Sequence, residues 1–141
     1  MAMLKLLEKL TTTAGVPGRE HRVRKLILNE IKGIFDEISV DPLGSIIAVK
    51  KARPKKGRAR KKPTKVMLAA HMDQIGFLVY HIDDKGFLYL NPVGGFDTRN
   101  LFARMVTVCP DPNDPKKDLV GILNPSGKTI HVASPEERKK I

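Results

Sequence analysis

The fold of this chain is decided in the stretch VMLAAHMDQIGFLV, residues 66–79, where two different sequence patterns meet. Residues 66–70 form an uninterrupted apolar run, which predicts a buried β-strand. His71 and Asp73 follow that run directly, and Gly76 opens a segment in which apolar residues alternate. We therefore predict a strand of an α/β layer that ends at His71, and a boundary near residue 76 beyond which the chain is all β.

Before this stretch the pattern is helical and then extended. Leucines at helical spacing predict a first helix, and a Gly- and Pro-rich segment at residues 15–18 ends it. A second, amphipathic helix with an arginine-rich outer face is predicted from Glu20; its apolar positions are Val23, Ile27, Ile31 and Ile34. Two short strands around a turn at residues 41–44 follow. This helix-then-strand order favours an α/β layer architecture.

After Gly76 the pattern is that of a small β-module. A β-hairpin is predicted by the alternation of Phe77 and Val79 and by a glycine-containing turn at residues 83–86. Further short strands are predicted between Pro- and Asp-rich turns, at residues 105–109, 119–123 and 129–132.

The end of the sequence carries the signature of a helix start. Ser134 is placed as N-cap, Pro135 as the first helical residue, and Glu137 completes a capping box. Since few residues follow, we expect the module to be incomplete at its C-terminus. The predicted organisation is therefore an α/β portion at residues 1–75 and a partial β-module at residues 76–141.

Composition sets the class of protein. The chain has 141 residues, of which 41% are hydrophobic and 29% charged, enough for one ordinary domain with a buried core. Its one cysteine, Cys109, allows no internal disulfide and fits a reducing compartment. No apolar stretch approaches the roughly 20 residues that a membrane span needs. We expect a soluble, cytoplasmic protein with no membrane partner.

The net charge of +11 is concentrated in one segment, which begins at Lys50 and ends at Lys65. These residues, 50–65, hold ten of the 26 basic residues and no acidic one, so the remainder is close to neutral. Rich in Pro, Gly and Ala, the segment predicts an exposed, self-repelling loop between two strands. Contact with an anionic polymer such as nucleic acid is the weaker interpretation, because the segment has no aromatic residue on which bases could stack.

His71 and Asp73 carry the chemistry of the opening stretch. Side chains two residues apart in extended backbone point to the same face, so the two should lie side by side while Met72 faces away. Neutral imidazole binds zinc and cobalt, and a neighbouring carboxylate can accept its second ring N–H and fix the tautomer. A polar strand end would contain the same residue types. Spacing alone therefore leaves both interpretations open.

The order of several segments resembles the N-terminal part of the glutamyl-aminopeptidase-like family of dinuclear metallopeptidases, the tetrahedral aminopeptidases. The matching segments begin at Ala14, Asp41, Val66, Gly86 and Ser134; they read AGVPGREHRVRKLI, DPLGSIIA, VMLAAHMDQIGFLV, GFLYLNPVGGFD and SPEERKK. They are spread over nearly the whole chain. The His-Met-Asp motif with its preceding strand is the most specific piece.

The resemblance implies that residues 1–75 are the N-terminal portion of a catalytic α/β domain and that the family's inserted dimerisation module follows. It implies that His71 is a metal ligand and that Asp73 is a catalytic residue that orients this histidine. Family members bind two divalent ions, zinc or cobalt, and remove N-terminal residues from peptides. Their dimers assemble into large hollow particles, so a homo-oligomer formed through the β-module is expected.

Departures from the family pattern limit what the chain should do alone. Family members are much longer, and their remaining ligands and glutamate general base lie in a second catalytic half. Gln74 stands where the family often has glutamate, which removes one charge near the site. Other polar residues are predicted to be surface, strand-face or turn residues: His21, His81, His131, Asp83 and Asp84.

We therefore expect the N-terminal part of a metal-dependent aminopeptidase that hydrolyses N-terminal residues from peptides. The chain alone should be catalytically incomplete, because His71 by itself cannot hold two ions. A non-catalytic assembly protein derived from this family is the alternative. Binding of an anionic polymer through residues 50–65 is a weaker one.

Overall fold

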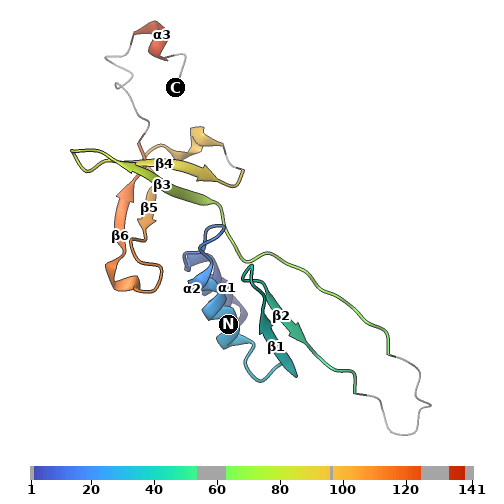
Figure 1. Cartoon of the computed structure of the whole chain (residues 1–141). Coiled ribbons are helices and arrows are strands. Elements are labelled where there is room, and N and C mark those ends of the chain that lie inside the picture. Colours follow the sequence, from blue (N-terminus) through green and yellow to red (C-terminus); the bar gives the residue numbers. More distant parts are fainter. Residues whose placement is uncertain (1, 54–62, 96, 125–133, 139–141) are drawn as a thin grey trace. The chain divides into compact units, whose positions relative to one another are not determined.

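The computed structural model describes residues 2–53, 63–95, 97–124 and 134–138, and the chain divides by packing into two compact units, Met1–Gly94 and Gly95–Ile141. Figure 1 shows their helices and strands in chain order. Within the described residues, every helix is too short or too polar to cross a membrane. The boundary predicted near residue 76 concerns the organisation of the family and stays a prediction.

Two helices open the first unit, α1 (Ala2–Thr12) and α2 (His21–Glu30), and both were predicted. An ion pair joins them, with Lys9 Nζ 3.3 Å from Glu30 Oε1. Gly15 and Val23 are the two buried residues in the described part of the chain. They pack against each other, since a Cβ added to Gly15 would lie 2.7 Å from Val23 Cγ1. The connection between the helices therefore forms the small core of this unit.

The second helix is shorter than predicted. It ends at Glu30, and the backbone N–H of Ile31 donates to the Ile27 carbonyl at 2.9 Å. Gly33 has a φ of +78°, a left-handed conformation that ends an α-helix. Ile34 consequently lies outside the helix and is 53% exposed. The extension of the helix to Ile34 was wrong because apolar spacing can continue across a turn that a glycine has already made.

A β-hairpin follows, in which β1 (Glu37–Val40) pairs antiparallel with β2 (Ile46–Val49). Asp41 closes the turn by accepting the backbone N–H four residues on, at 2.8 Å, and Gly44 has a φ of +93°. The turn predicted at residues 41–44 is confirmed. Arg24 of α2 donates from Nη1 to the Gly44 carbonyl at 3.0 Å, so the arginine-rich face of that helix is not wholly solvated.

The hairpin predicted after Gly76 is confirmed as β3 (Gly76–Ile82) and β4 (Leu88–Val93), paired antiparallel. Asp83 Oδ1 accepts two backbone N–H groups of the turn, at 3.0 and 2.8 Å. Gly86 has a φ of +83°, which favours glycine at this position. The turn is therefore held by one aspartate and one glycine, the residue types from which it was predicted.

The described residues of the second unit contain one more hairpin, β5 (Met105–Val108) with β6 (Leu119–Ile122), which confirms two further predicted strands. Its short helices are η1 (Thr98–Leu101), η2 (Pro115–Lys117) and α3 (Pro135–Arg138). The last begins directly after Ser134, as the capping pattern predicted. The strand predicted at residues 129–132 lies outside the described residues.

The fold is mixed α and β, with three separate two-stranded sheets in the described residues. The prediction of a strand at residues 66–70 was wrong, because residues 63–75 belong to no helix or strand. Val66, Met67 and Leu68 are 80%, 88% and 93% exposed. An apolar run becomes a strand only where a neighbour supplies ladder hydrogen bonds, and the described residues place none beside it.

Candidate metal centre at His71 and Asp73

His71 and Asp73 lie side by side in the extended segment that leads into β3. His71 Nδ1 is 3.2 Å from Asp73 Oδ1 and 3.0 Å from the Asp73 backbone oxygen. The predicted proximity of the two side chains is therefore observed although the segment belongs to no sheet.

The position of Asp73 determines which ring nitrogen of His71 faces outward. Nδ1 faces two oxygen atoms, so the hydrogen-bond pattern assigns the proton to Nδ1. Nε2 then keeps its lone pair. The His71 side chain is 85% exposed and that of Asp73 is 36% exposed. This arrangement is the one in which a carboxylate orients a histidine for binding to a metal.

The next residue, Gln74, anchors the motif to the connection between α1 and α2. Its backbone N–H donates to the Gly15 carbonyl at 2.8 Å, and its side-chain Nε2 donates to the Thr13 carbonyl at 3.2 Å. Gly76 continues the contact, because a Cβ there would overlap Val16 Cγ1. From the sequence, Gln74 was expected only to remove one negative charge near the site. These hydrogen bonds could not be predicted from a local sequence pattern, because they join residues far apart in the sequence.

The other candidate residues lie in separate places. His81 lies on β3, with its ring centroid 5.3 Å from that of Tyr89, and Asp83 holds the β3–β4 turn. His131 lies outside the described residues. Among the residues that are described, no group of three or more His, Cys, Asp or Glu side chains converges. The described residues therefore bring together the candidate ligand His71 and the Asp73 carboxylate, and not a whole ligand set.

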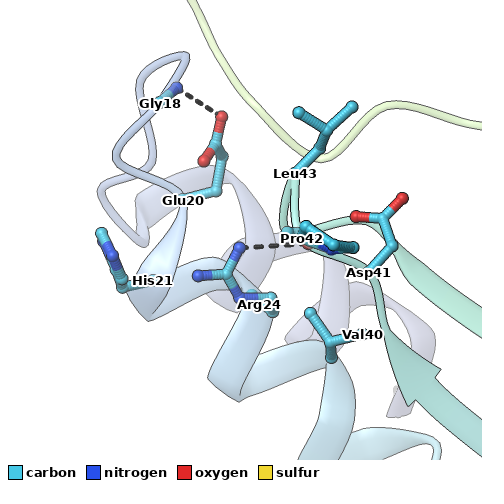
Figure 2. Close-up of a pocket in the computed structure, with 9 residues that line it drawn as sticks. Gly18, Glu20, His21, Arg24, Val40, Asp41, Pro42 and Leu43 are labelled. Atoms are coloured by element: carbon cyan, nitrogen blue, oxygen red, sulfur yellow. Dashed lines mark hydrogen bonds between the residues drawn. The ribbon is translucent and has the colours of Figure 1, made fainter.

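His21 lines an open hollow of about 300 Å³ between the start of α2 and the β1–β2 turn. Figure 2 shows Arg24 pointing from the helix to the turn, and Glu20 turned back to the Gly18 N–H. His71 and Asp73 are not among the residues that line this hollow. The hollow is thus a feature of the α2–hairpin junction and not of the His71 site.

Part of the basic segment is paired locally. Lys51 Nζ forms an ion pair with Glu37, and this hydrogen bond raises the pKa of Lys51. The backbone N–H of Lys51, 2.7 Å from Asp36 Oδ2, lowers the pKa of that carboxyl, and Arg53 lies 3.6 Å from its other oxygen. The described start of the basic segment therefore pairs with Asp36 and Glu37, the acidic residues at the start of the β1–β2 hairpin. Residues 54–62 lie outside the described part.

Comparison with known proteins gives a consistent family. The family model described as M42 glutamyl aminopeptidase matches residues 44–141. A putative aminopeptidase of Acetivibrio thermocellus is 50% identical over 104 residues, which are 74% of this chain and 29% of that protein.

Solved structures of aminopeptidases also match this chain. The crystal structure of a TET aminopeptidase from a marine sediment archaeon of the Thaumarchaeota matches with a TM-score of 0.80 and 28% identity, over 100% of this chain and 36% of that one. The TET1 peptidase of Pyrococcus horikoshii, which can assemble into a tetrahedron or a large octahedral shell, matches with a TM-score of 0.71 and 30% identity, over 95% and 36%.

The chain thus spans about a third of the length of the relatives it matches. The family model covers most of its residues, including His71 and Asp73. The chain belongs to the M42 glutamyl aminopeptidase family.

Proposed function

We propose that this chain supplies the His71–Asp73 part of a two-metal site in an aminopeptidase that hydrolyses N-terminal residues from peptides. The observation that carries the proposal is the 3.2 Å contact between His71 Nδ1 and Asp73 Oδ1, together with the exposure of the ring. It is supported by membership of the family and by relatives that are named aminopeptidases.

Two side chains perform the work assigned to this chain. His71 would bind one ion through Nε2, and Asp73 would keep the proton on Nδ1 and make the imidazole a stronger ligand. When bound, a pair of zinc or cobalt ions would supply Lewis-acid polarisation of the peptide carbonyl. The general base and the other ligands are assigned to the part of the relatives that this chain does not match. The chain alone is therefore proposed to be catalytically incomplete.

A chimera tests this proposal. The 141 residues would replace the matched region of the Acetivibrio thermocellus relative, which is 50% identical over 104 residues. Release of nitroaniline from aminoacyl nitroanilides would be measured with zinc or cobalt. We expect an active chimera, loss of activity in His71→Ala, and roughly 10–100-fold weaker metal binding in Asp73→Ala. Asp73→Asn keeps an acceptor for the His71 Nδ1–H and should therefore lose less metal affinity than Asp73→Ala. Full activity of the His71→Ala chimera would refute the proposed role.

The hairpins after Gly76 are proposed to be the inserted module through which copies of the whole protein associate. Large apolar side chains on these strands are exposed, among them Tyr80 at 69%, Val120 at 79% and Ile122 at 65%. Exposed large apolar side chains on these strands favour an interface with another copy. The assembly of the Pyrococcus horikoshii peptidase is consistent with this proposal.

Light scattering tests the assembly. We expect the wild-type chimera to form an oligomer and Val120→Lys to reduce its mass. A monomeric wild-type chimera would contradict the proposed interface. A cytoplasmic location remains part of the proposal and rests on the single cysteine, Cys109, which fits a reducing compartment.

A further inference from the structure

We propose that Gln74 is a positioning residue that holds the Asp73 backbone carbonyl, and with it the Asp73 side chain, against His71 Nδ1 by fastening the motif to the α1–α2 connection. This inference rests on the proposed function of His71 and Asp73. Any residue at this position can make the backbone bond of the anchor, whereas the side-chain bond needs a donor that a carboxylate lacks.

The fastening consists of two hydrogen bonds from one residue. The backbone N–H of Gln74 donates to the Gly15 carbonyl at 2.8 Å, and Nε2 donates to the Thr13 carbonyl at 3.2 Å. Thr13 directly follows α1, so its carbonyl is among those that a helix end leaves without an intrahelical partner. The residue next to Asp73 is therefore bound to two carbonyl groups that the helix end and its connection present.

The connection that accepts these bonds is itself fixed by packing. Gly15 is buried against Val23, which is 2% exposed, and a Cβ at Gly15 would come within 2.7 Å of Val23 Cγ1. On the other side of the connection, Val16 lies directly against Gly76. Because these contacts hold residues 13–16 from both sides, the two acceptors of Gln74 occupy fixed positions.

The effect reaches His71 through one peptide unit. Asp73 offers His71 Nδ1 two oxygens, its own backbone carbonyl at 3.0 Å and its carboxylate at 3.2 Å. The carbonyl of Asp73 belongs to the same peptide plane as the Gln74 N–H. Fixing that N–H on Gly15 therefore fixes the orientation of the oxygen that faces the imidazole.

Donor chemistry explains why glutamine suits this position. An amide can donate to the Thr13 carbonyl, whereas an ionised carboxylate can only accept. Glutamate at 74 would place two oxygen atoms against a carbonyl oxygen, with a net charge added. Gln74→Glu therefore keeps the size of the side chain and the backbone bond to Gly15, and removes the bond from Nε2 to Thr13.

The experiment reads the tautomer of His71 in the 141-residue chain by long-range ¹H–¹⁵N correlation spectra, at a pH about two units above the ordinary histidine pKa. Wild type should show the proton mainly on Nδ1. In Gln74→Glu and in Gln74→Met, which lacks the donor without adding charge, the Nδ1–H fraction should fall by roughly twofold or more, which needs only part of the free energy of one hydrogen bond.

Two variants serve as controls. Asn91→Asp makes the same amide-to-acid change at an exposed position of β4 and should leave the tautomer of His71 as in wild type. Asp83→Ala weakens the β3–β4 turn and should lower the melting temperature without changing the tautomer. A purely structural role of Gln74 predicts that its variants behave like Asp83→Ala. Folded Gln74 variants with a wild-type tautomer would overturn the proposal.

The activity of the His71→Ala chimera separates this inference from the proposed function. Full activity of that chimera, with the tautomer still dependent on Gln74 in the 141-residue chain, would refute the proposed function of His71 and support the positioning role. Loss of its activity, with a tautomer that is unchanged in Gln74→Glu, would refute the positioning role alone.

Discussion

Arg24 Nη1 donates a 3.0 Å hydrogen bond to the carbonyl oxygen of Gly44, and this bond fastens α2 to the β1–β2 turn. The guanidinium lies against the Gly44 Cα so closely that an added methyl group would overlap Nη1. Gly44 also has a φ of +93°, which a side chain disfavours. Conformation therefore favours glycine at this position, and an added methyl group would also displace the Arg24 guanidinium from its bond to the Gly44 carbonyl.

Gly44→Ala should reduce the free energy of unfolding by more than backbone strain alone, which is about 1–3 kcal/mol. Gly18→Ala is the matched control, because Gly18 has a φ of +77° and nothing within 4 Å of an added Cβ. Urea unfolding followed by circular dichroism measures both. Equal losses in the two variants would show that the contact with Arg24 contributes nothing.

Val23→Ala should destabilise the first unit by about 1–3 kcal/mol, because it removes buried methyl groups and leaves a cavity beside Gly15. Val66→Ala is the same change at a side chain that is 80% exposed and should stay within about 0.5 kcal/mol of wild type. Thermal unfolding of the two variants compares them directly. A similar loss at both positions would contradict the assignment of the core to the helix connection.

Asp83→Ala should weaken the β3–β4 hairpin by about 1 kcal/mol, because Oδ1 of Asp83 accepts two backbone N–H groups. Asp84→Ala removes the neighbouring carboxylate and serves as the control. Hydrogen exchange of the Phe87 amide, which donates to Asp83 at 2.8 Å, should become faster in the first variant only. Faster exchange in both would assign the effect to charge and not to the turn.

The contact between Asp36 and Lys51 predicts that the free energy of unfolding decreases as the pH falls in the acidic range. The Lys51 N–H lowers the pKa of Asp36 in the folded chain, so the unfolded chain takes up the proton first as the pH falls. The stabilisation is therefore fully present above about pH 4 and is lost as the pH falls through the lowered folded pKa.

Asp36→Asn should accordingly lose less stability than wild type between about pH 5 and about pH 3. Urea midpoints at the two pH values give the comparison. An identical decrease of the urea midpoint in wild type and in Asp36→Asn would show that Asp36 does not cause the loss of stability at low pH.

The hairpins could be predicted because their determinants are local. Asp83 with Gly86, and Asp41 with Gly44, close turns within a few residues of one another, and the alternation of side chains needs no distant partner. The end of α2 was misplaced because Gly33 outweighed an apolar spacing that continued beyond it.

The site could be predicted in part. His71 and Asp73 are two residues apart, so their contact follows from the geometry of extended backbone. The bonds of Gln74 could not be foreseen, because Thr13 lies 61 residues earlier in the sequence. The strand expected at residues 66–70 failed for a related reason, since strand pairing depends on a neighbour that sequence pattern does not identify.

The 61-residue separation of Thr13 and Gln74 bears on how the site evolves and folds. In the unfolded chain, bringing these two residues together costs about 3–4 kcal/mol of closure entropy, and this cost rises only with the logarithm of the length between them. A dozen residues added to the basic segment would raise it by only about 0.2 kcal/mol. The connection from Lys50 to Lys65 can therefore vary in length with little effect on how readily the His71–Asp73 motif reaches its anchor.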